Sequence, residues 1–428
     1  MNKKIKPRNS ITATIEVQGD KSISHRAVMI GAIAKGVTEI YGFLNGNDCM
    51  NTIKCMRELG VKIDVDEKEN TVVVDGVGLE GLQPPKEQLD VGNSGTAMRM
   101  LSGILAAQEF DSTVTGDEYI CRRPMKRIID PLNKMGASIT GVNDNYAPLE
   151  IKGRKLSGIS YNMPVASAQV KSSILLAGLY AKGETIVIEP ALCRDHTEIM
   201  LKNFGAEISK KDKVTFLRPS RQLYGKSINI PGDISSAAFF IVAALIVPNS
   251  QITIKNVGLN FTRTGILSIL KDMGARIEIL NRQILSGEWI GDIKVTSSQL
   301  FGTTIQGGVI PRAIDEIPIA AVAAAFATGT TIIKGAKELR VKESDRIHVM
   351  AEHLKTMGVD VIETEDGLII EGKGGKGLKS GTFDSFGDHR IAMSMAVAGL
   401  ALPDGCEIEN AEWANVSFTN FYDNLENI

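Results

Sequence analysis

The sequence feature that most constrains the fold is a short motif that recurs along the whole chain. Each copy is an apolar residue, a glycine, an alanine or valine, one variable residue and an isoleucine or valine, as in residues 59–63. The glycine fits the left-handed conformation that commonly follows a helix end, and the β-branched residue is typical of the start of a strand. The motif therefore predicts repeated helix-to-strand junctions. Its glycines are Gly60, Gly136, Gly205, Gly274 and Gly358.

A second element, a helix of small and aliphatic residues, recurs in phase with this motif. Because each of these helices is apolar nearly all round, we expect it to be buried. Two elements that repeat together predict six α+β units of about seventy residues, the last of them shortened at residues 421–428. The expected buried helices span residues 24–34, 94–107, 168–181, 235–247, 317–327 and 389–401.

The bulk composition limits the kinds of partner that the chain can have. At 428 residues it is too long for one ordinary core, so we expect two domains with three units each. Its 48 basic and 50 acidic residues leave a net charge of −2, which excludes a general attraction to nucleic acid or to acidic membranes. The longest apolar run, residues 237–247, is too short to span a bilayer. Any anion site must therefore be local.

The cysteines and the first eight residues indicate in which cellular compartment the protein works. Five cysteines, an odd number without a CxxC pair, argue against a disulfide framework. The basic residues 1–8 have no apolar stretch behind them and so do not resemble a signal peptide. We therefore expect a cytoplasmic protein. Similar turns at residues 19–20 and 231–233 precede the first and fourth buried helices, which predicts paired crossovers between the domains and a ligand cleft between them.

The N-termini of the buried helices are candidate anion sites, because they present unpaired backbone N–H groups and the positive end of the helix dipole. Each polar cluster is a weak signal alone, but clusters at equivalent positions of four units predict a shared anion-binding function. The four segments are residues 19–26, 92–96, 167–169 and 387–390.

A denser mixed cluster lies at residues 339–346, between the strand-like residues 330–333 and the next helix. Arginine forks bind carboxylate or phosphate, while a carboxylate in the same cluster remains for proton transfer. The simpler interpretation is a surface network of salt bridges, in which Glu343 pairs with Arg340 or Arg346.

Two adjacent carboxylates, Asp315 and Glu316, stand at the head of the fifth buried helix. We expect desolvation and the like charge to raise a carboxylate pKa there toward the working range of a general base. The alternative is a carboxylate that only stabilises the helix dipole. His196 and His389 have no second metal-type ligand at a suitable spacing, so we expect them to orient neighbours and predict no metal site.

In their order along the chain these motifs resemble those of the 3-phosphoshikimate 1-carboxyvinyltransferase (EPSP synthase) family, from about residue 19 to the end. Residues 167–171, 194–198 and 260–263 are similar to the class II branch, whose members often tolerate glyphosate. In one departure, Val416 stands where some members carry a lysine. The matching segments are residues 19–22, 92–96, 123–125, 167–171, 194–198, 260–263, 339–346 and 388–390.

The resemblance implies a fold and a division into domains. The fold class is α/β, built of α+β repeats: a two-domain inverse α/β-prism with six βαβαββ units, which agrees with the repeat count above. Residues 1–19 and 232–428 would form the C-terminal domain and residues 20–231 the N-terminal domain. The active site would lie in the cleft between them.

The resemblance also implies a reaction. The enolpyruvyl group of phosphoenolpyruvate would pass to the 5-hydroxyl of shikimate 3-phosphate by addition and elimination, with release of phosphate. This reaction needs a base for the hydroxyl, an acid for the methylene carbon and cations for the anionic groups. It needs no metal and no organic cofactor. The expected partners are the two small substrates alone, without nucleic acid or membrane, and the expected state is a monomer.

The family pattern assigns site residues to both substrates. Asp315 would take the 5-hydroxyl proton, Glu343 would serve C3 of the enolpyruvyl group, and Lys21 is the third catalytic candidate. The residues implied for shikimate 3-phosphate are Lys21, Ser22, Arg26, Ser167, Ala168 (through its backbone), Gln169, Arg194, Asp315 and Lys342. Those implied for phosphoenolpyruvate are Lys21, Asn93, Gly95, Arg123, Gln169, Glu343, Arg346 and Arg390.

Two other functions remain as alternatives. The sister enzyme that transfers enolpyruvate to UDP-N-acetylglucosamine carries a reactive cysteine shortly before an Arg-Pro pair, and Cys121 lies two residues before Arg123 here. The Gly-Cys-x-x-Gly setting of that loop is missing, so we interpret Cys121 as incidental. The second alternative, a non-catalytic repeat protein that binds anions, would not need carboxylates among its arginines.

Overall fold

The computed structural model describes residues 1–428 and divides into two compact units. The predicted domain boundaries, after residues 19 and 231, lie one residue beyond the observed ones. The sequence did not indicate that Leu285–Glu288, the turn of a long hairpin, belongs with the unit formed by the first half of the chain. Unit 1 comprises Met1–Gln18, Pro231–Ile284 and Trp289–Ile428, and unit 2 comprises Gly19–Ile230 and Leu285–Glu288.

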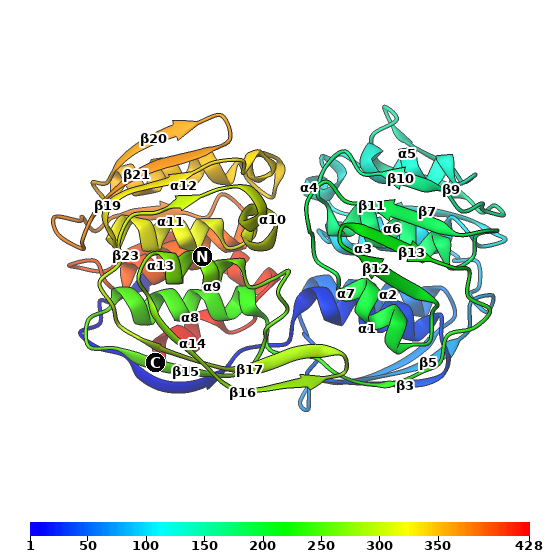
Figure 1. Ribbon diagram of the computed structural model, residues 1–428, viewed down its shortest axis with the longest axis horizontal. Coiled ribbons are helices and arrows are strands. Elements are labelled where there is room, and N and C mark those ends of the chain that lie inside the picture. The colour runs from blue at the N-terminus through cyan, green and yellow to red at the C-terminus, as the bar shows by residue number, and fades with distance from the viewer. The chain divides into compact units, whose positions relative to one another are not determined.

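Unit 2 contains three sheets of four strands each (Figure 1). Its strands are β3 (Lys35–Tyr41), β4 (Lys62–Asp66), β5 (Thr71–Val77), β6 (Leu89–Asp90), β7 (Asp111–Thr115), β8 (Ser138–Val142), β9 (Tyr146–Lys152), β10 (Ser160–Asn162), β11 (Thr185–Ile188), β12 (Ile208–Lys211), β13 (Val214–Leu217) and β14 (Ser227–Asn229). The orders are β14-β3-β5-β4, β6-β7-β9-β8 and β10-β11-β13-β12. In each sheet the first pair is parallel and the other pairs are antiparallel. A parallel pair requires a crossover connection, which a buried helix supplies between β6 and β7 and between β10 and β11.

Unit 1 repeats this pattern with one truncation. Its strands are β1 (Lys3–Ile5), β2 (Thr12–Glu16), β15 (Gln251–Gly258), β16 (Arg276–Leu285), β17 (Glu288–Thr296), β18 (Thr304–Ile305), β19 (Thr328–Ile333), β20 (Asp360–Thr364), β21 (Gly367–Lys373), β22 (Thr382–Asp384) and β23 (Cys406–Glu409). Two sheets have four strands, β16-β17-β15-β2 and β18-β19-β21-β20, and the third has three, β1-β23-β22. The N-terminal β1 pairs antiparallel with β23 and so takes the position of the hairpin that the shortened last repeat lacks.

Three helices form the core of each unit. They are α1 (Lys21–Ala32), α3 (Gly95–Leu105) and α6 (Ala168–Gly178) in unit 2, and α8 (Ile234–Ile246), α11 (Ile317–Phe326) and α13 (His389–Gly399) in unit 1. Their side chains are buried on nearly every face, as the sequence predicts. In unit 2, α3 packs against α1 and α6, and in unit 1 the three helices pack against one another. The first helix begins three residues earlier than predicted, because the Asp20 carboxylate accepts from Ile23 N and caps it at Lys21.

A second set of helices precedes the glycines of the repeated motif. These are α2 (Asn47–Glu58), α5 (Lys126–Lys134), α7 (His196–Asn203), α9 (Gly265–Asp272) and α12 (Arg346–Thr356), with the short α14 (Phe421–Glu426) as the sixth. The glycine after each of the first five has a φ between 82° and 101°, which confirms the predicted left-handed helix ends. Short helices also occur at α4 (Glu118–Cys121) and α10 (Ile310–Ala313). No helix combines the length and the apolar character that crossing a membrane requires.

Candidate active site

The first buried helix of unit 2 begins with a lysine and ends its second turn with a buried arginine. Lys21 Nζ lies 3.2 Å from Asp48 Oδ2 of α2, and both side chains keep some exposure. Arg26 is buried and donates to the Ser22 carbonyl at 2.8 Å and to Thr197 Oγ1 at 2.7 Å. Arg26 therefore ties α1 to α7 in this structure, while Lys21 faces a more open environment.

The second buried helix carries two guanidinium groups beside its N-terminus. Arg123 Nη2 donates to Asn93 Oδ1 at 2.8 Å, and Asn93 Nδ2 donates to Asp117 Oδ2 at 2.9 Å. A Cβ added at Gly95 would lie 3.0 Å from Arg99 Nη1 and 3.3 Å from Arg123 Nη1. The absence of a side chain at Gly95 thus lets two cations approach the backbone of a helix N-terminus, which is a favourable setting for an anion.

The third buried helix is joined to the second through Gln169. The Gln169 amide donates to Thr96 Oγ1 at 3.0 Å and accepts from Arg99 Nη1. Ser167 caps α6 by accepting from Val170 N at 3.4 Å. The predicted residues Ser167, Ala168 and Gln169 thus lie at one helix N-terminus. Arg99 was missed as a site residue, although its spacing of one helical turn from Gly95 on α3 was a usable signal.

Behind Arg194 lies a buried ion cluster that the sequence did not predict. Lys171 Nζ is 2.7 Å from Glu189 Oε1 and 2.6 Å from Glu198 Oε1, and the Lys171 and Glu189 side chains are 0% exposed. Burial alone lowers the pKa of Lys171, but the charges around it, Glu198 foremost, outweigh this effect and raise it. Because Glu189 and Glu198 flank the loop between β11 and α7, the cluster holds in place the loop that carries the partly exposed Arg194.

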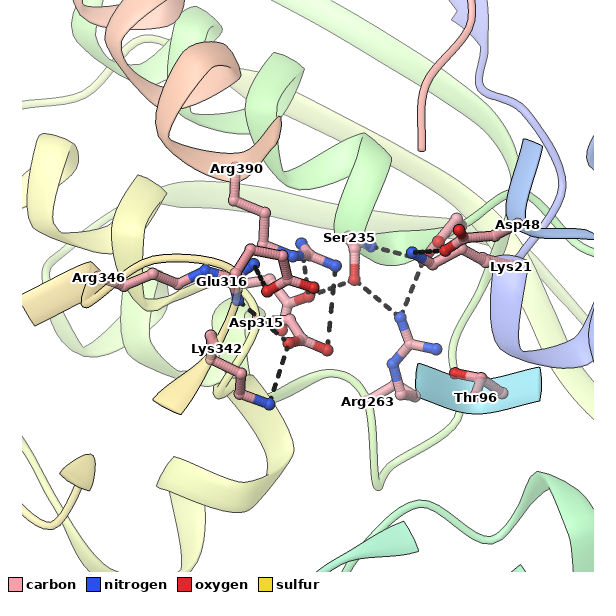
Figure 2. A network of polar contacts seen from close by, with 12 residues as sticks. Lys21, Asp48, Thr96, Ser235, Arg263, Asp315, Glu316, Lys342, Arg346 and Arg390 are labelled. Carbon is pink, nitrogen blue, oxygen red and sulfur yellow. Dashed lines mark hydrogen bonds and ion pairs between the residues drawn. The ribbon is translucent and has the colours of Figure 1, made fainter. Parts of the chain in front are cut away.

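In unit 1 the densest cluster surrounds Arg346, the first residue of α12 (Figure 2). Its side chain is 1% exposed, donating from Nε to Asp388 Oδ2 and from Nη2 to Glu343 Oε2, each at 2.7 Å. Its Nη1 lies 3.6 Å from Asp315 Oδ1. Burial acts to lower the pKa of Arg346, but the charge of Asp388, followed by that of Glu343, outweighs it and raises it.

The two carboxylates that the sequence singled out lie at the open edge of this cluster. Asp315 is 16% exposed, with Lys342 Nζ at 4.0 Å and Arg390 Nη2 at 3.9 Å (Figure 2). Glu343 is 21% exposed. The structure therefore brings together the five predicted site residues of unit 1, from three separate segments. They are Asp315, Lys342, Glu343, Arg346 and Arg390.

The alternative interpretation of Glu343 as a salt-bridge partner is also correct in part, because it pairs with Arg346. Arg340, the other arginine of that segment, instead pairs with Asp345 at 2.8 Å and Glu363 at 2.9 Å. The segment lies between a strand and a helix as predicted, and the sequence did not indicate the 3₁₀ helix, Lys337–Val341, that intervenes between β19 and α12. It turns Arg340 away from the cluster and leaves Arg346 to enter it.

Glu316, next to Asp315, has a different environment and is 0% exposed. It accepts a hydrogen bond from Ser235 Oγ, and its Oε1 lies 3.8 Å from Arg390 Nη1 (Figure 2). Arg263 Nη2 donates to the same Ser235 hydroxyl at 2.8 Å. Glu316 therefore fixes the arginine that its neighbour Asp315 also contacts. The sequence marked Arg263 as part of a motif, but no sequence pattern indicated its link to Ser235.

One cysteine takes part in these clusters, because Cys193 Sγ donates to Glu189 Oε1 at 2.6 Å beside Lys171. His196 Nδ1 lies 2.7 Å from Glu288 Oε1, so it orients a neighbour as predicted. Cys121 is half-buried, and its Sγ lies 3.5 Å from the Gly116 carbonyl. No group of three or more His, Cys, Asp or Glu side chains is arranged to hold a metal ion.

Each unit presents its own chemistry. Unit 2 supplies cations and helix N-termini, which bind phosphate and carboxylate groups. Unit 1 combines cations with two partly exposed carboxylates, an arrangement that can neutralise an anionic substrate while it moves protons.

Comparison with known proteins agrees with this chemistry. The family model described as EPSP synthase (3-phosphoshikimate 1-carboxyvinyltransferase) matches residues 5–425. The 3-phosphoshikimate 1-carboxyvinyltransferases of Thermoanaerobacter sp. (strain X514) and Desulforamulus reducens are 53% identical over 422 residues and 51% identical over 425 residues. These alignments cover 99% of this chain and 99% and 98% of the two relatives.

A solved structure of EPSP synthase from Acinetobacter baumannii has a TM-score of 0.89 and 46% sequence identity, and the match covers 100% of this chain and 98% of that one. The fold that the sequence predicted is therefore confirmed. The chain belongs to the EPSP synthase family, whose members transfer the enolpyruvyl group of phosphoenolpyruvate to shikimate 3-phosphate in the shikimate pathway.

Proposed function

We propose that this protein carries out the family's transfer with Asp315 and Glu343 as its proton-transferring groups. The observation that carries the proposal is the graded burial of the Arg346 cluster. Asp315 and Glu343 are partly exposed, while Arg346 beside them is held from behind by the buried Asp388. A substrate can therefore reach the carboxylates without displacing the groups that fix their partners.

In the addition step, Asp315 takes the proton of the 5-hydroxyl of shikimate 3-phosphate as its oxygen bonds to C2 of phosphoenolpyruvate. Glu343 delivers a proton to C3, which gives a tetrahedral intermediate. In the elimination step, C3 loses a proton, the bond between C2 and the phosphate oxygen breaks, and phosphate leaves. Each proton moves between a substrate atom and a carboxylate, so no redox partner is required.

Arg346 connects substrate binding to the acid role of Glu343. In this structure Glu343 occupies one edge of the Arg346 guanidinium at 2.7 Å. A substrate carboxylate or phosphate that binds this guanidinium competes with Glu343 for the same donors. Losing that partner and gaining a neighbouring anion both favour the protonated form of Glu343. We propose that phosphoenolpyruvate, by binding Arg346, favours the protonated form of Glu343 that then donates the proton to C3.

The remaining assignments follow the residues that each unit presents. We propose that shikimate 3-phosphate contacts the helix N-termini of unit 2 and reaches Asp315, through Lys21, Ser22, Arg26, Ser167, Ala168, Gln169, Arg194 and Lys342. For phosphoenolpyruvate we propose Lys21, Asn93, Gly95, Arg123, Gln169, Glu343, Arg346 and Arg390. Arg26 contributes through its charge and its hold on Ser22, because its guanidinium already bonds Ser22, Thr197 and Ser172.

The deciding experiment measures phosphate release from phosphoenolpyruvate with shikimate 3-phosphate as acceptor. Asp315→Asn and Glu343→Gln should each lower kcat by about 10²-fold or more, because each removes a proton-transfer group while keeping the shape. The affinity for shikimate 3-phosphate, measured by calorimetry, should change by less than about threefold for Glu343→Gln. Near wild-type turnover in either variant would contradict that role.

Glu352→Gln is the matched control, because Glu352 lies on the same helix α12 but is exposed and pairs only with Lys355. It should turn over at the wild-type rate. Replacing shikimate 3-phosphate by UDP-N-acetylglucosamine tests the sister reaction, and phosphate release with that acceptor alone would favour it. Binding of both anions without any phosphate release would favour a non-catalytic protein.

We also propose that the protein works as a cytoplasmic monomer of the class II type. The absence of a disulfide among its five cysteines and the cluster chemistry within one chain support this proposal. Light scattering at micromolar concentration should give a mass near 46.1 kDa. A mass of twice that value would contradict the monomer.

A further inference from the structure

His25 lies within the polar segment that opens α1, yet the proposed chemistry gives it no task. The side chain is completely buried. Its Nδ1 is 2.7 Å from Thr52 Oγ1 on α2, and its Nε2 is 3.5 Å from Ser94 Oγ, the cap of α3. The imidazole therefore contacts two helices besides its own, and all three helix N-termini contribute to the site.

The direction of each hydrogen bond follows from the partners. Ser94 Oγ accepts from Ala97 N at 3.1 Å, which leaves its own proton for the Nε2 of His25. Thr52 Oγ1 donates to the Asp48 carbonyl at 3.4 Å, which leaves it to accept from Nδ1–H. A neutral ring that carries its proton on Nδ1 satisfies both partners.

The surroundings keep the ring neutral. Burial, followed by the charges of Lys21 and Arg26, lowers the pKa of His25 to about 3, and Asp20 opposes this shift. A neutral imidazole both donates and accepts, so it can join a donor and an acceptor on different helices. It does so without adding a charge that would need its own counter-ion beside an anion site.

The two ends of this hydrogen-bonded chain hold residues of the site. Ser94 precedes Gly95, whose Cβ position would lie 3.0 Å from Arg99 Nη1 and 3.3 Å from Arg123 Nη1. At such distances a displacement of a few tenths of an ångström changes how much room remains between the Gly95 backbone and the two guanidinium groups. At the other end, the chain reaches the backbone of the residue whose carboxylate binds Lys21.

We propose that His25 is a positioning and specificity-determining residue. It sets the spacing between the Lys21 end of α1 and the Gly95 turn of α3, and hence the size of the anionic group that Arg99 and Arg123 accept. The inference rests on the proposed function, because phosphoenolpyruvate is the anion assigned to this turn. A loosened turn weakens phosphoenolpyruvate binding and reduces discrimination against longer phosphonates.

Two isosteric variants separate the two hydrogen bonds. Asn at position 25 keeps a donor near Nδ1 but loses the acceptor for Ser94, whereas Gln places its amide near Nε2 and keeps that acceptor. His25→Asn should raise the KM for phosphoenolpyruvate about tenfold, with kcat and the KM for shikimate 3-phosphate within about threefold of wild type. His25→Gln should raise the KM for phosphoenolpyruvate by less than about threefold.

The same variants should differ in selectivity. The ratio of the inhibition constant of glyphosate to the KM for phosphoenolpyruvate should fall in His25→Asn and hold in His25→Gln. Equal effects of the two variants, or equal rises in the KM values of both substrates, would mean that His25 only stabilises the core, and would overturn the proposal.

His353→Asn is the matched control for the loss of a buried imidazole, because His353 lies about two turns along α12 from Arg346, and its Nε2 bonds the Asp384 carbonyl at 2.8 Å. It should lower the melting temperature without separating the two KM values. If His25→Asn does not fold, Ser94→Ala and Ser94→Thr replace it, because they respectively lose and keep the hydroxyl that bonds His25 Nε2. The alanine variant should raise the KM for phosphoenolpyruvate more than the threonine variant, and equal KM values in the two would overturn the proposal.

Two separate measurements distinguish failure of the proposed transfer reaction from failure of the proposed role of His25. A wild-type protein that releases no phosphate from the two substrates refutes the transfer reaction itself. Calorimetry with phosphoenolpyruvate alone still compares His25→Asn with His25→Gln. A weaker affinity in the asparagine variant supports the positioning role, and equal affinities refute it.

Discussion

Each unit buries a cluster of ionic side chains, but only in unit 1 are two carboxylates of the cluster partly exposed. In unit 2, Lys171 and Glu189 are 0% exposed and Glu198 is 7% exposed. In unit 1, Arg346 is equally buried, yet it contacts carboxylates that are 16% and 21% exposed. The two clusters hold similar groups at similar distances and differ in access.

This difference teaches how to separate a structural ion cluster from a reactive one. Both clusters raise the pKa of their central cation, Lys171 or Arg346, by surrounding it with carboxylates. A perturbed pKa therefore does not distinguish them. The distinguishing feature is that burial around Arg346 falls off toward Asp315 and Glu343, so that one side holds the geometry and the other side meets a substrate.

The largest expected effect comes from removing each central cation. Lys171→Met should lower the free energy of unfolding by about 3 kcal/mol, because it leaves two buried carboxylates with only the partly exposed Lys210 as counter-ion. The folded fraction should retain turnover within about threefold of wild type, because Lys171 touches no substrate. Urea denaturation and the phosphate-release assay measure the two quantities.

Removing the partners as well sharpens this comparison. Adding Glu189→Gln and Glu198→Gln to Lys171→Met should restore part of the stability, since no uncompensated buried charge remains and Lys210, which is 20% exposed, can reach water. In unit 1, Arg346→Met with Asp388→Asn should likewise regain stability but not turnover. Recovery of turnover in the unit 1 double variant would show that the two clusters do not differ in function.

The repeats were predictable because their signals are local. A glycine after a helix and an apolar helix each depend on residues within about ten positions, so Gly60 and its counterparts could be predicted directly. The contacts that complete the site are not local. Glu316 meets Ser235, which lies 81 positions away, and Lys171 meets Glu189, which lies 18 positions away across a strand. No spacing rule predicts such pairs.

The family resemblance identified which residues form the site, whereas only the structure showed how deeply they are buried and what they contact. Resemblance named Asp315, Glu343 and Arg346 together, and the structure brings them into one cluster. It did not indicate the graded burial of that cluster. It also gave no role to His25, because a buried histidine between two polar residues has no distinguishing spacing.

An intermediate effect is expected from the pH dependence of stability in unit 2. The pKa of His25 is about 3 in the folded protein and near 6.5 in an unfolded chain. Below pH 6.5 the unfolded state therefore binds a proton that the folded state does not, and stability falls until about pH 3. At pH 5 this loss amounts to about 2 kcal/mol relative to pH 8, and His25→Asn should not show it.

Lys171 and Glu189 should not contribute to the pH dependence of stability over the same range. The pKa of Lys171 is raised above its ordinary value, and that of Glu189, which burial acts to raise, is lowered by Lys171 and its hydrogen bonds. Neither therefore changes its proton between pH 5 and 8. Burial also lowers the pKa of His353 in unit 1, so His353→Asn measures that contribution separately. An identical pH dependence in wild type and His25→Asn would contradict the assignment.

The smallest expected effect tests the open side of unit 2, at Gly95. In Gly95→Ala the new methyl group would lie 3.0 Å from Arg99 Nη1 and 3.3 Å from Arg123 Nη1, so both flexible guanidinium groups must shift by a few tenths of an ångström. One methyl group in a binding pocket typically changes selection by about 1–3 kcal/mol. We expect inhibition by glyphosate to weaken by about tenfold, near the lower end of that range. The KM for phosphoenolpyruvate should rise by less than about threefold, because the shifted guanidinium groups can still reach this smaller ligand.

Gly308→Ala is the matched control, since a Cβ at Gly308 meets nothing within 4 Å, and it should change neither the inhibition by glyphosate nor the KM for phosphoenolpyruvate. Submicromolar glyphosate inhibition of the wild-type enzyme at low phosphoenolpyruvate would contradict the class II assignment. An equal loss of both ligands in Gly95→Ala would show that this turn binds their common anionic group without selecting between them.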